Sequence, residues 1–191
     1  MKKLACLMIA LMVIAMFVTT GCKNVKPNTE EVADSDTIVE EIFVFPDTTI
    51  YGICGEGSTM HTLELVTDED DTLTFLVDDE EMGAVGIVGG LIAGDRIAVV
   101  GHRVGDELIT DRAVNLTTLV GKWTSLDKNF EMMEGGVVNS HVKAEAYPWT
   151  TWKICNGYLL LNKDTFSVVE LGADSLFLEN DKGIFTYKRQ S

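Results

Sequence analysis

From residue 42 onward the chain alternates short apolar runs with turn residues, and no run shows the apolar period of a long helix. Val, Ile, Thr, Leu and Phe dominate these runs, and such residues favour strands. The chain has 191 residues, which is room for one large domain or two small ones. The pattern predicts a mostly β protein with two small antiparallel barrel-like domains, at residues 42–118 and 119–191.

Five strands are expected in the first domain, with a Gly-rich segment after the third that favours a short helix or a buried loop. An acidic hairpin turn at residues 67–71 joins the second strand to the third. Five strands with such an insert resemble the OB-fold, and Leu91–Val99 resembles the entry to its fourth strand. The expected strands cover residues 43–54, 61–67, 72–77, 96–103 and 107–118.

The second domain begins near Gly121-Lys122-Trp123 and continues as a series of short strands with tight turns. Asn156-Gly157 is typical of a type I′ hairpin turn. This arrangement resembles the Gly-x-Trp start of lipocalin-type domains, and in particular the small lipocalin-like domains of exported lipoproteins from Bacteroides-type bacteria. The stretch is short for a full lipocalin, which argues against a roomy ligand cavity. The expected strands cover residues 150–154, 158–162, 166–171, 175–179 and 184–189.

The first residues carry an export signal. Lys2 and Lys3 precede an apolar stretch of 15 residues, Leu4–Val18, which is too short to span a bilayer. Gly21-Cys22 then resembles the lipobox of bacterial lipoproteins. The resemblance implies that residues 1–21 are removed and that Cys22 carries diacylglycerol and palmitate. An ordinary signal peptide with a coincidental cysteine is the alternative, and Thr19 stands where the family usually has Leu.

The residue after Cys22 bears on localisation. It is Lys23 rather than Asp, which by the same resemblance argues for the outer membrane and leaves the leaflet open. Residues 22–41 are polar and acidic without a hydrophobic period, as in a flexible tether. The sequence therefore predicts a cell-envelope protein that is held to the membrane through Cys22.

Net charge excludes one class of partner. The whole chain has a formal charge of −15, and loss of the two lysines of the signal makes the mature chain more negative still. The expected second and third strands contain no Lys or Arg, so binding of nucleic acid has no electrostatic basis. The same charge disfavours docking onto anionic lipid.

Residues with reactive side chains are few, and each has a simpler structural explanation. Cys54 and His61 could act as a nucleophile and a base, but their positions on neighbouring strands are the simpler explanation, which we favour. His102 and His141 show no metal-ligand spacing, and the acidic run at residues 68–71 has Leu73 where a calcium loop needs Gly. We therefore expect no enzyme, no cofactor and no metal site. Cys54 and Cys155 are expected to be two buried free thiols rather than a disulfide.

Aromatic residues of the second domain are the remaining candidates for function. Trp123, Trp149, Trp152 and Tyr158 either fill the core of a small barrel or contact a small apolar or amphipathic ligand. Pro148 favours a loop that leaves Trp149 exposed near the barrel mouth. The first hypothesis is ligand binding by the lipocalin-like domain. The alternative is a structural or protein–protein interaction module of an outer-membrane assembly.

Overall fold

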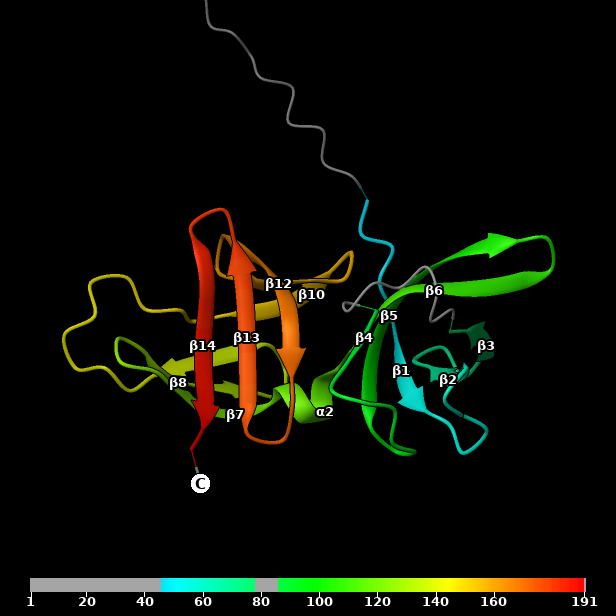
Figure 1. The fold of residues 1–191 in the computed structure, drawn as a ribbon, viewed down its shortest axis with the longest axis horizontal. Helices are drawn as coiled ribbons and strands as arrows, with labels where there is room; N and C mark the ends of the chain where they lie inside the picture. The colour runs from blue at the N-terminus through cyan, green and yellow to red at the C-terminus, as the bar shows by residue number, and fades with distance from the viewer. Residues whose placement is uncertain (1–45, 78–85, 191) are drawn as a thin grey trace, which may run out of the picture. The chain divides into compact units, whose positions relative to one another are not determined.

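Strands form two sheets in the computed structural model, which describes residues 46–77 and 86–190 (Figure 1). The predicted mostly β class, with two barrel-like sheets, is confirmed. The signal, the lipidation site and the tether at residues 1–41 lie outside the described residues, as does much of the Gly-rich insert, residues 78–85.

The first sheet is a closed five-stranded barrel with one short added strand. Its strand order is β3-β2-β1-β5-β6-β4, and a parallel pairing of β3 with β6 closes the ring. This order and this closure are those of an OB-type barrel, as the sequence predicted. The strands are β1 (Ile50–Cys54), β2 (Thr62–Thr67), β3 (Thr72–Leu76), β4 (Ile87–Val88), β5 (Arg96–Val104) and β6 (Glu107–Asn115).

The fifth expected strand ends earlier than predicted because a short helix follows it. Asn115 ends β6 and caps α2 (Leu116–Leu119) by accepting a hydrogen bond from the backbone N–H of Thr118 at 2.8 Å. Its amide group also donates to the Asp95 carboxylate at 2.6 Å. Asn is among the preferred N-cap residues, because its side-chain oxygen satisfies an unpaired N–H of the first turn.

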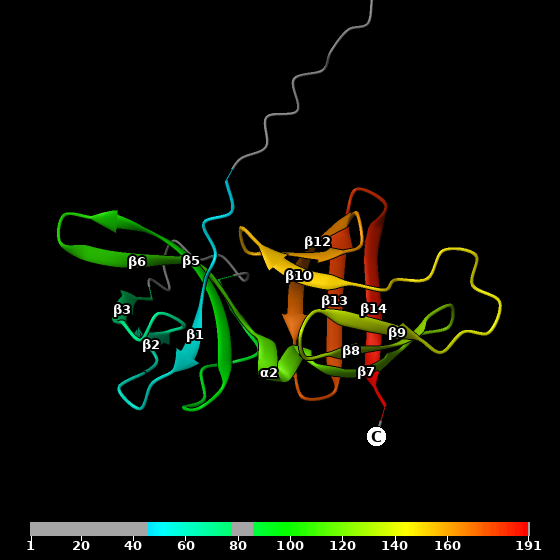
Figure 2. The same ribbon diagram turned by 180° about the vertical axis from the view of Figure 1, so that it is seen from behind.

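The second sheet is a nearly closed eight-stranded meander. Its order is β10-β11-β12-β13-β14-β7-β8-β9 (Figure 2). An isolated bridge pairs Val137 of β9 with Thr151, the residue before β10. The strands are β7 (Gly121–Thr124), β8 (Asn129–Met133), β9 (Val137–Ser140), β10 (Trp152–Cys155), β11 (Tyr158–Leu161), β12 (Asp164–Leu171), β13 (Ser175–Asn180) and β14 (Gly183–Arg189).

Two strands of this sheet, β8 and β9, were not predicted. Both are short, and a Gly135-Gly136 turn joins them with positive φ at both glycines. In β8 the inward residues are Phe130 and Met132, which alternate with polar and exposed neighbours. Two inward side chains are a weak periodic signal, so sequence reasoning passed over the strand.

Asn156 links the first described residues to the second sheet. It forms the predicted tight turn with Gly157, at φ values of 49° and 77°. Its side-chain oxygen accepts hydrogen bonds from the N–H of Thr48 at 2.8 Å and from the Thr48 hydroxyl at 3.0 Å. Its backbone N–H donates to the Thr49 hydroxyl at 2.8 Å, and its amide donates to the Pro46 carbonyl at 3.2 Å.

Apolar side chains form two buried clusters. The smaller fills the first barrel and includes Leu63, Phe75 and Ile97. The larger fills the second sheet and also takes in Ala98 and Val114, which lie on the outer face of the first barrel. The two sheets therefore share one hydrophobic cluster, while their division into separate domains at residue 118 stays an interpretation.

Both described cysteines are free thiols, as predicted. Cys54 is buried inside the first barrel, with 1% of its surface exposed. Cys155 is only half-buried, so the prediction that both are buried is wrong for this residue. The reason is its position at the end of β10, next to the tight turn. Burial and the neighbouring Asp47 raise the pKa of the Cys155 thiol.

Tyr187 makes the fold sensitive to alkaline pH. It is 3% exposed on β14, and its ring meets that of Phe130 edge-on at 5.2 Å. Burial raises the pKa of Tyr187 to about 12, so the neutral form is favoured in the folded state. The contribution of neutral Tyr187 to the free energy of unfolding is fully present below the ordinary tyrosine pKa of about 10. About 2–3 kcal/mol of that free energy is lost as the pH rises to about 12.

Urea denaturation between pH 9 and pH 12 measures this loss. The Tyr187→Phe variant is expected to lose markedly less stability over that range. Tyr147→Phe is the control, because Tyr147 is 89% exposed. Equal losses in the natural chain and in Tyr187→Phe would contradict the prediction.

Candidate functional site

The three tryptophans predicted as ligand contacts lie together in the larger hydrophobic cluster. Trp123 is fully buried, and its indole N–H donates to the Leu119 carbonyl at 2.9 Å. Trp149 is 8% exposed, so the expected exposure at the barrel mouth is wrong. It does lie outside the strands, but its ring meets Phe130 edge-on at 5.2 Å and lies under Lys128. These contacts make Trp123 and Trp149 part of the packed core.

Tyr158, the fourth predicted contact, is not with the tryptophans. It is 45% exposed on the outer face of β11, where the guanidinium of Arg112 lies 5.4 Å from its ring centre. Arg112 comes from β6 and also donates to the Val168 carbonyl at 2.8 Å. Tyr158 therefore contributes to the contact between the two sheets.

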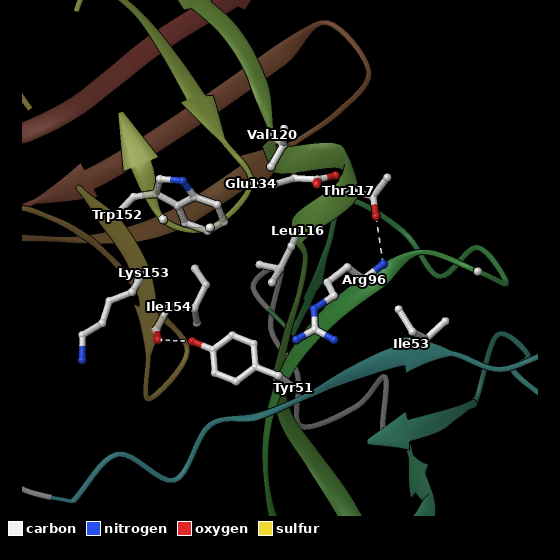
Figure 3. A pocket seen from close by; sticks show the side chains of 13 residues that line it. Tyr51, Ile53, Arg96, Leu116, Thr117, Val120, Glu134, Trp152, Lys153 and Ile154 are labelled. Atoms are coloured by element: carbon white, nitrogen blue, oxygen red, sulfur yellow. Dashed lines mark hydrogen bonds between the residues drawn. The ribbon is translucent and has the colours of Figure 1, made fainter. Parts of the chain in front are cut away.

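A pocket of about 810 Å³ lies where the two sheets meet, and we call it the inter-sheet pocket (Figure 3). Strands β1 and β5 of the first sheet form one wall, α2 lies along a second side, and β10 with the β8–β9 turn forms the opposite wall. Trp152 is the predicted contact that borders it. Its lining residues are Tyr51, Ile53, Gly94, Arg96, Leu116, Thr117, Val120, Glu134, Gly135, Gly136, Trp152, Lys153 and Ile154.

Tyr51 spans the pocket from the first sheet to the second. It points outward from β1, and its hydroxyl donates to the Ile154 carbonyl of β10 at 2.6 Å (Figure 3). Arg96 lies beside it, with the guanidinium 6.0 Å from the centre of the Tyr51 ring. Burial raises the pKa of Tyr51, so its hydroxyl stays protonated as a donor at neutral pH.

The basic groups at the rim are already paired. Both terminal nitrogens of Arg96 donate to the Asp68 carboxylate, which lowers the pKa of Asp68. The backbone N–H of Arg96 donates to the Thr117 hydroxyl at 2.8 Å, and Lys153 lies 3.7 Å from Asp47. These ion pairs leave the pocket without a concentrated positive charge, and Glu134 adds a carboxylate to its lining, so the pocket is not suited to an anionic ligand.

Glu134 and Thr117 add a carboxylate and a hydroxyl to the lining, and much of the remaining wall is apolar. Ile53 is 38% exposed and contributes an aliphatic side chain from β1, while Leu116 and Val120 contribute others from α2 and its end. On the opposite wall Trp152 presents an indole ring, whose N–H is already bonded to the Met133 carbonyl at 2.8 Å. Apolar walls with a few fixed polar groups are typical of sites for small amphipathic molecules.

Sequence reasoning missed Tyr51 and Arg96 because it treated the two sheets separately. Tyr51 and Ile53 alternate with inward residues along β1, and this alternation does place them on the outer face. Nothing in the sequence says which outward residues meet the other sheet. That depends on packing between residues more than one hundred positions apart, such as Tyr51 and Ile154.

Across residues 46–77 and 86–190, no group of three His, Cys, Asp or Glu side chains is placed to hold a metal ion. Within the same residues, no helix has the length and apolar character needed to cross a membrane.

Comparison of this chain with models of protein families, with curated proteins and with solved structures gives no match.

Proposed function

We propose that this chain is a non-enzymatic, lipid-anchored protein of the bacterial cell envelope that binds a small amphipathic ligand in the inter-sheet pocket. The observation that carries the binding proposal is this pocket itself. Its volume of about 810 Å³ lies within the usual range for small-molecule sites. Aliphatic and aromatic side chains from both sheets line it.

The site differs from the one expected in the sequence, which was the interior of the lipocalin-like domain. Trp123 and Trp149 pack inside that domain against Leu119, Phe130 and other core residues, so we place the ligand between the sheets. Trp152 keeps its proposed role as a contact. Its indole also supplies a fluorescence signal for binding.

A fluorescent amphiphile tests the proposal. Residues 23–191 are titrated into Nile red, a fluorophore without charge, and saturable binding is expected. Ile53→Asp is expected to weaken it by about tenfold or more, because bound apolar groups would desolvate the new carboxylate. Val104→Asp is the matched control, since Val104 is 55% exposed and lies on the β5–β6 hairpin away from the pocket. Equal affinities of the two variants would contradict the proposal.

Anchoring rests on the sequence of the first 22 residues. The apolar stretch Leu4–Val18 and the small residues before Cys22 support export and lipidation of that cysteine. Lys23 supports sorting to the outer membrane. The acidic residues that follow suit a tether, because repulsion between like charges extends it.

A role as a protein–protein interaction module is the second candidate. A hollow of about 1010 Å³ lies along β13 and β14, and Phe177 and Ile184 line it. Leu126 at its border is fully exposed, and Ile184 is 62% exposed. Exposed apolar side chains around a hollow are typical of surfaces that contact other proteins. Loss of fluorophore binding in Ile184→Asp, with Ile53→Asp unaffected, would favour this candidate.

A further inference from the structure

Two side chains that could donate a hydrogen bond into the inter-sheet pocket are already engaged. The Tyr51 hydroxyl donates to the Ile154 carbonyl at 2.6 Å, and the indole N–H of Trp152 donates to the Met133 carbonyl at 2.8 Å. A hydroxyl group or an indole ring has a single hydrogen to donate. Neither side chain can therefore donate to a ligand without breaking a bond within the protein.

The two basic side chains of the lining are engaged as well. Both terminal nitrogens of Arg96 donate to the Asp68 carboxylate. The ammonium group of Lys153 lies 3.7 Å from the Asp47 carboxylate. Since the charges of each pair sum to zero, neither pair gives the pocket a free positive charge.

Glu134 is the acidic residue of the lining, and it has no such partner. Within residues 46–77 and 86–190, no hydrogen bond or ion pair engages its carboxylate. Figure 3 shows its side chain at the pocket, with the carboxylate pointing toward Thr117 of α2. The charged groups of the lining, counted together with their partners, therefore leave one negative charge uncompensated.

The backbone around Glu134 is held in place by bonds to Trp152. The backbone N–H of Trp152 donates to the Gly136 carbonyl at 2.8 Å, and its indole N–H donates to the Met133 carbonyl. These two acceptors lie on either side of Glu134, so they fix the β8–β9 turn against β10. A Cβ at Gly136 would lie 2.9 Å from the Trp152 carbonyl oxygen, so this close approach requires glycine. The turn thus keeps a carboxylate and an indole ring on the same wall.

From this arrangement we infer that the ligand of the inter-sheet pocket is an amphipathic amine, with one positively charged nitrogen and an apolar body. The ammonium group pairs with the Glu134 carboxylate beside Trp152, whose aromatic face also attracts a cation. The apolar body contacts the aliphatic side chains of Ile53, Leu116 and Val120. This inference rests on the proposed function and names the chemical class of its ligand.

The charge of the whole chain favours the same class. Its formal charge is −15 at neutral pH. A strongly negative protein attracts cations to its surface and repels anions. An amine is therefore concentrated near the pocket, whereas a fatty acid with the same apolar body is repelled.

Two probes with the same apolar tail test the inference. Decylamine carries an ammonium group at neutral pH, and decanol carries an uncharged hydroxyl. Each displaces Nile red from residues 23–191, at concentrations below those at which it forms micelles. Decylamine is expected to act at about tenfold lower concentration, because hydrogen bonds between charged groups are stronger than those to neutral ones. The indole N–H resonance of Trp152 is expected to move as decylamine binds.

Two variants assign this preference to one residue. Glu134→Gln keeps the shape of the side chain and removes its charge, so it is expected to abolish the preference for the amine. Glu107→Gln is the matched control, because Glu107 is an exposed carboxylate on the β5–β6 hairpin and does not line the pocket. It is expected to keep the preference. Since both probes are compared within each variant, a change in stability does not alter their ratio.

The outcomes separate this inference from the proposed function. Displacement of Nile red by both probes at equal concentrations would overturn the amine inference and leave the pocket proposal standing. A preference that survives in Glu134→Gln, or that is lost equally in Glu107→Gln, would also overturn it, since the net charge of the chain would then attract the amine. Failure of both Nile red and decylamine to bind would overturn both proposals.

Discussion

Replacing Trp123 with Ala is expected to lower the free energy of unfolding by about 3–5 kcal/mol. Trp123 is fully buried in the cluster that fills the second sheet. The substitution removes its packing, leaves the Leu119 carbonyl without the indole N–H, and takes away the ring 4.2 Å from the guanidinium of Arg189. Since single domains have a total free energy of unfolding of about 5–15 kcal/mol, this loss is a large fraction of the total.

Guanidinium denaturation of residues 23–191 measures the effect as a shift of the midpoint. Leu126→Ala is the matched control, because it also removes an apolar side chain but from a fully exposed position. Its stability is expected to stay within about 0.5 kcal/mol of the natural chain. A loss below about 1 kcal/mol for Trp123→Ala would contradict the assignment of this residue to the core.

Replacing Cys22 with Ser is expected to abolish incorporation of a palmitate analogue into the protein. A serine hydroxyl does not take the thioether-linked diacylglycerol that the lipobox resemblance implies. Since the same resemblance ties removal of residues 1–21 to Cys22, the variant is expected to keep the apolar stretch Leu4–Val18, so lipid labelling is the decisive measurement and membrane fractionation is not. Labelling of cells with the palmitate analogue, followed by isolation of the protein, measures the loss.

Cys6→Ser is the control for this experiment. Cys6 lies within the apolar core of the signal and is expected to leave with it. This variant should remain labelled and membrane-bound. Continued labelling of Cys22→Ser would show that the lipid is attached elsewhere.

Much of the fold could be predicted because turn residues and alternation are local signals. Asn156-Gly157 marked its hairpin correctly, and the run at residues 72–77 matches β3 almost to the residue. The strand predicted through residue 118 ends instead at Asn115. The side chain of Asn115, which caps α2, also donates a hydrogen bond to Asp95, a residue twenty positions earlier. Such a contact leaves no local trace in the sequence.

The candidate site was much harder to predict than the fold. The aromatic residues of the second half were predicted to contact a ligand. In the structure, Trp123 is buried in the core and Tyr158 lies outside it. Trp152 was identified because it is aromatic, and it does line the inter-sheet pocket. The other residues of that pocket come from both sheets, and only the packing of the sheets brings them together.

The bonds around Asn156 have a mechanical consequence for the proposed anchoring through Cys22. Under that proposal, a pull on the chain reaches the described residues at Pro46, and Asn156 holds Pro46 and Thr48 before β1 begins. These hydrogen bonds would pass part of the load to the β10–β11 hairpin, so that β1 would not be the first element to bear it.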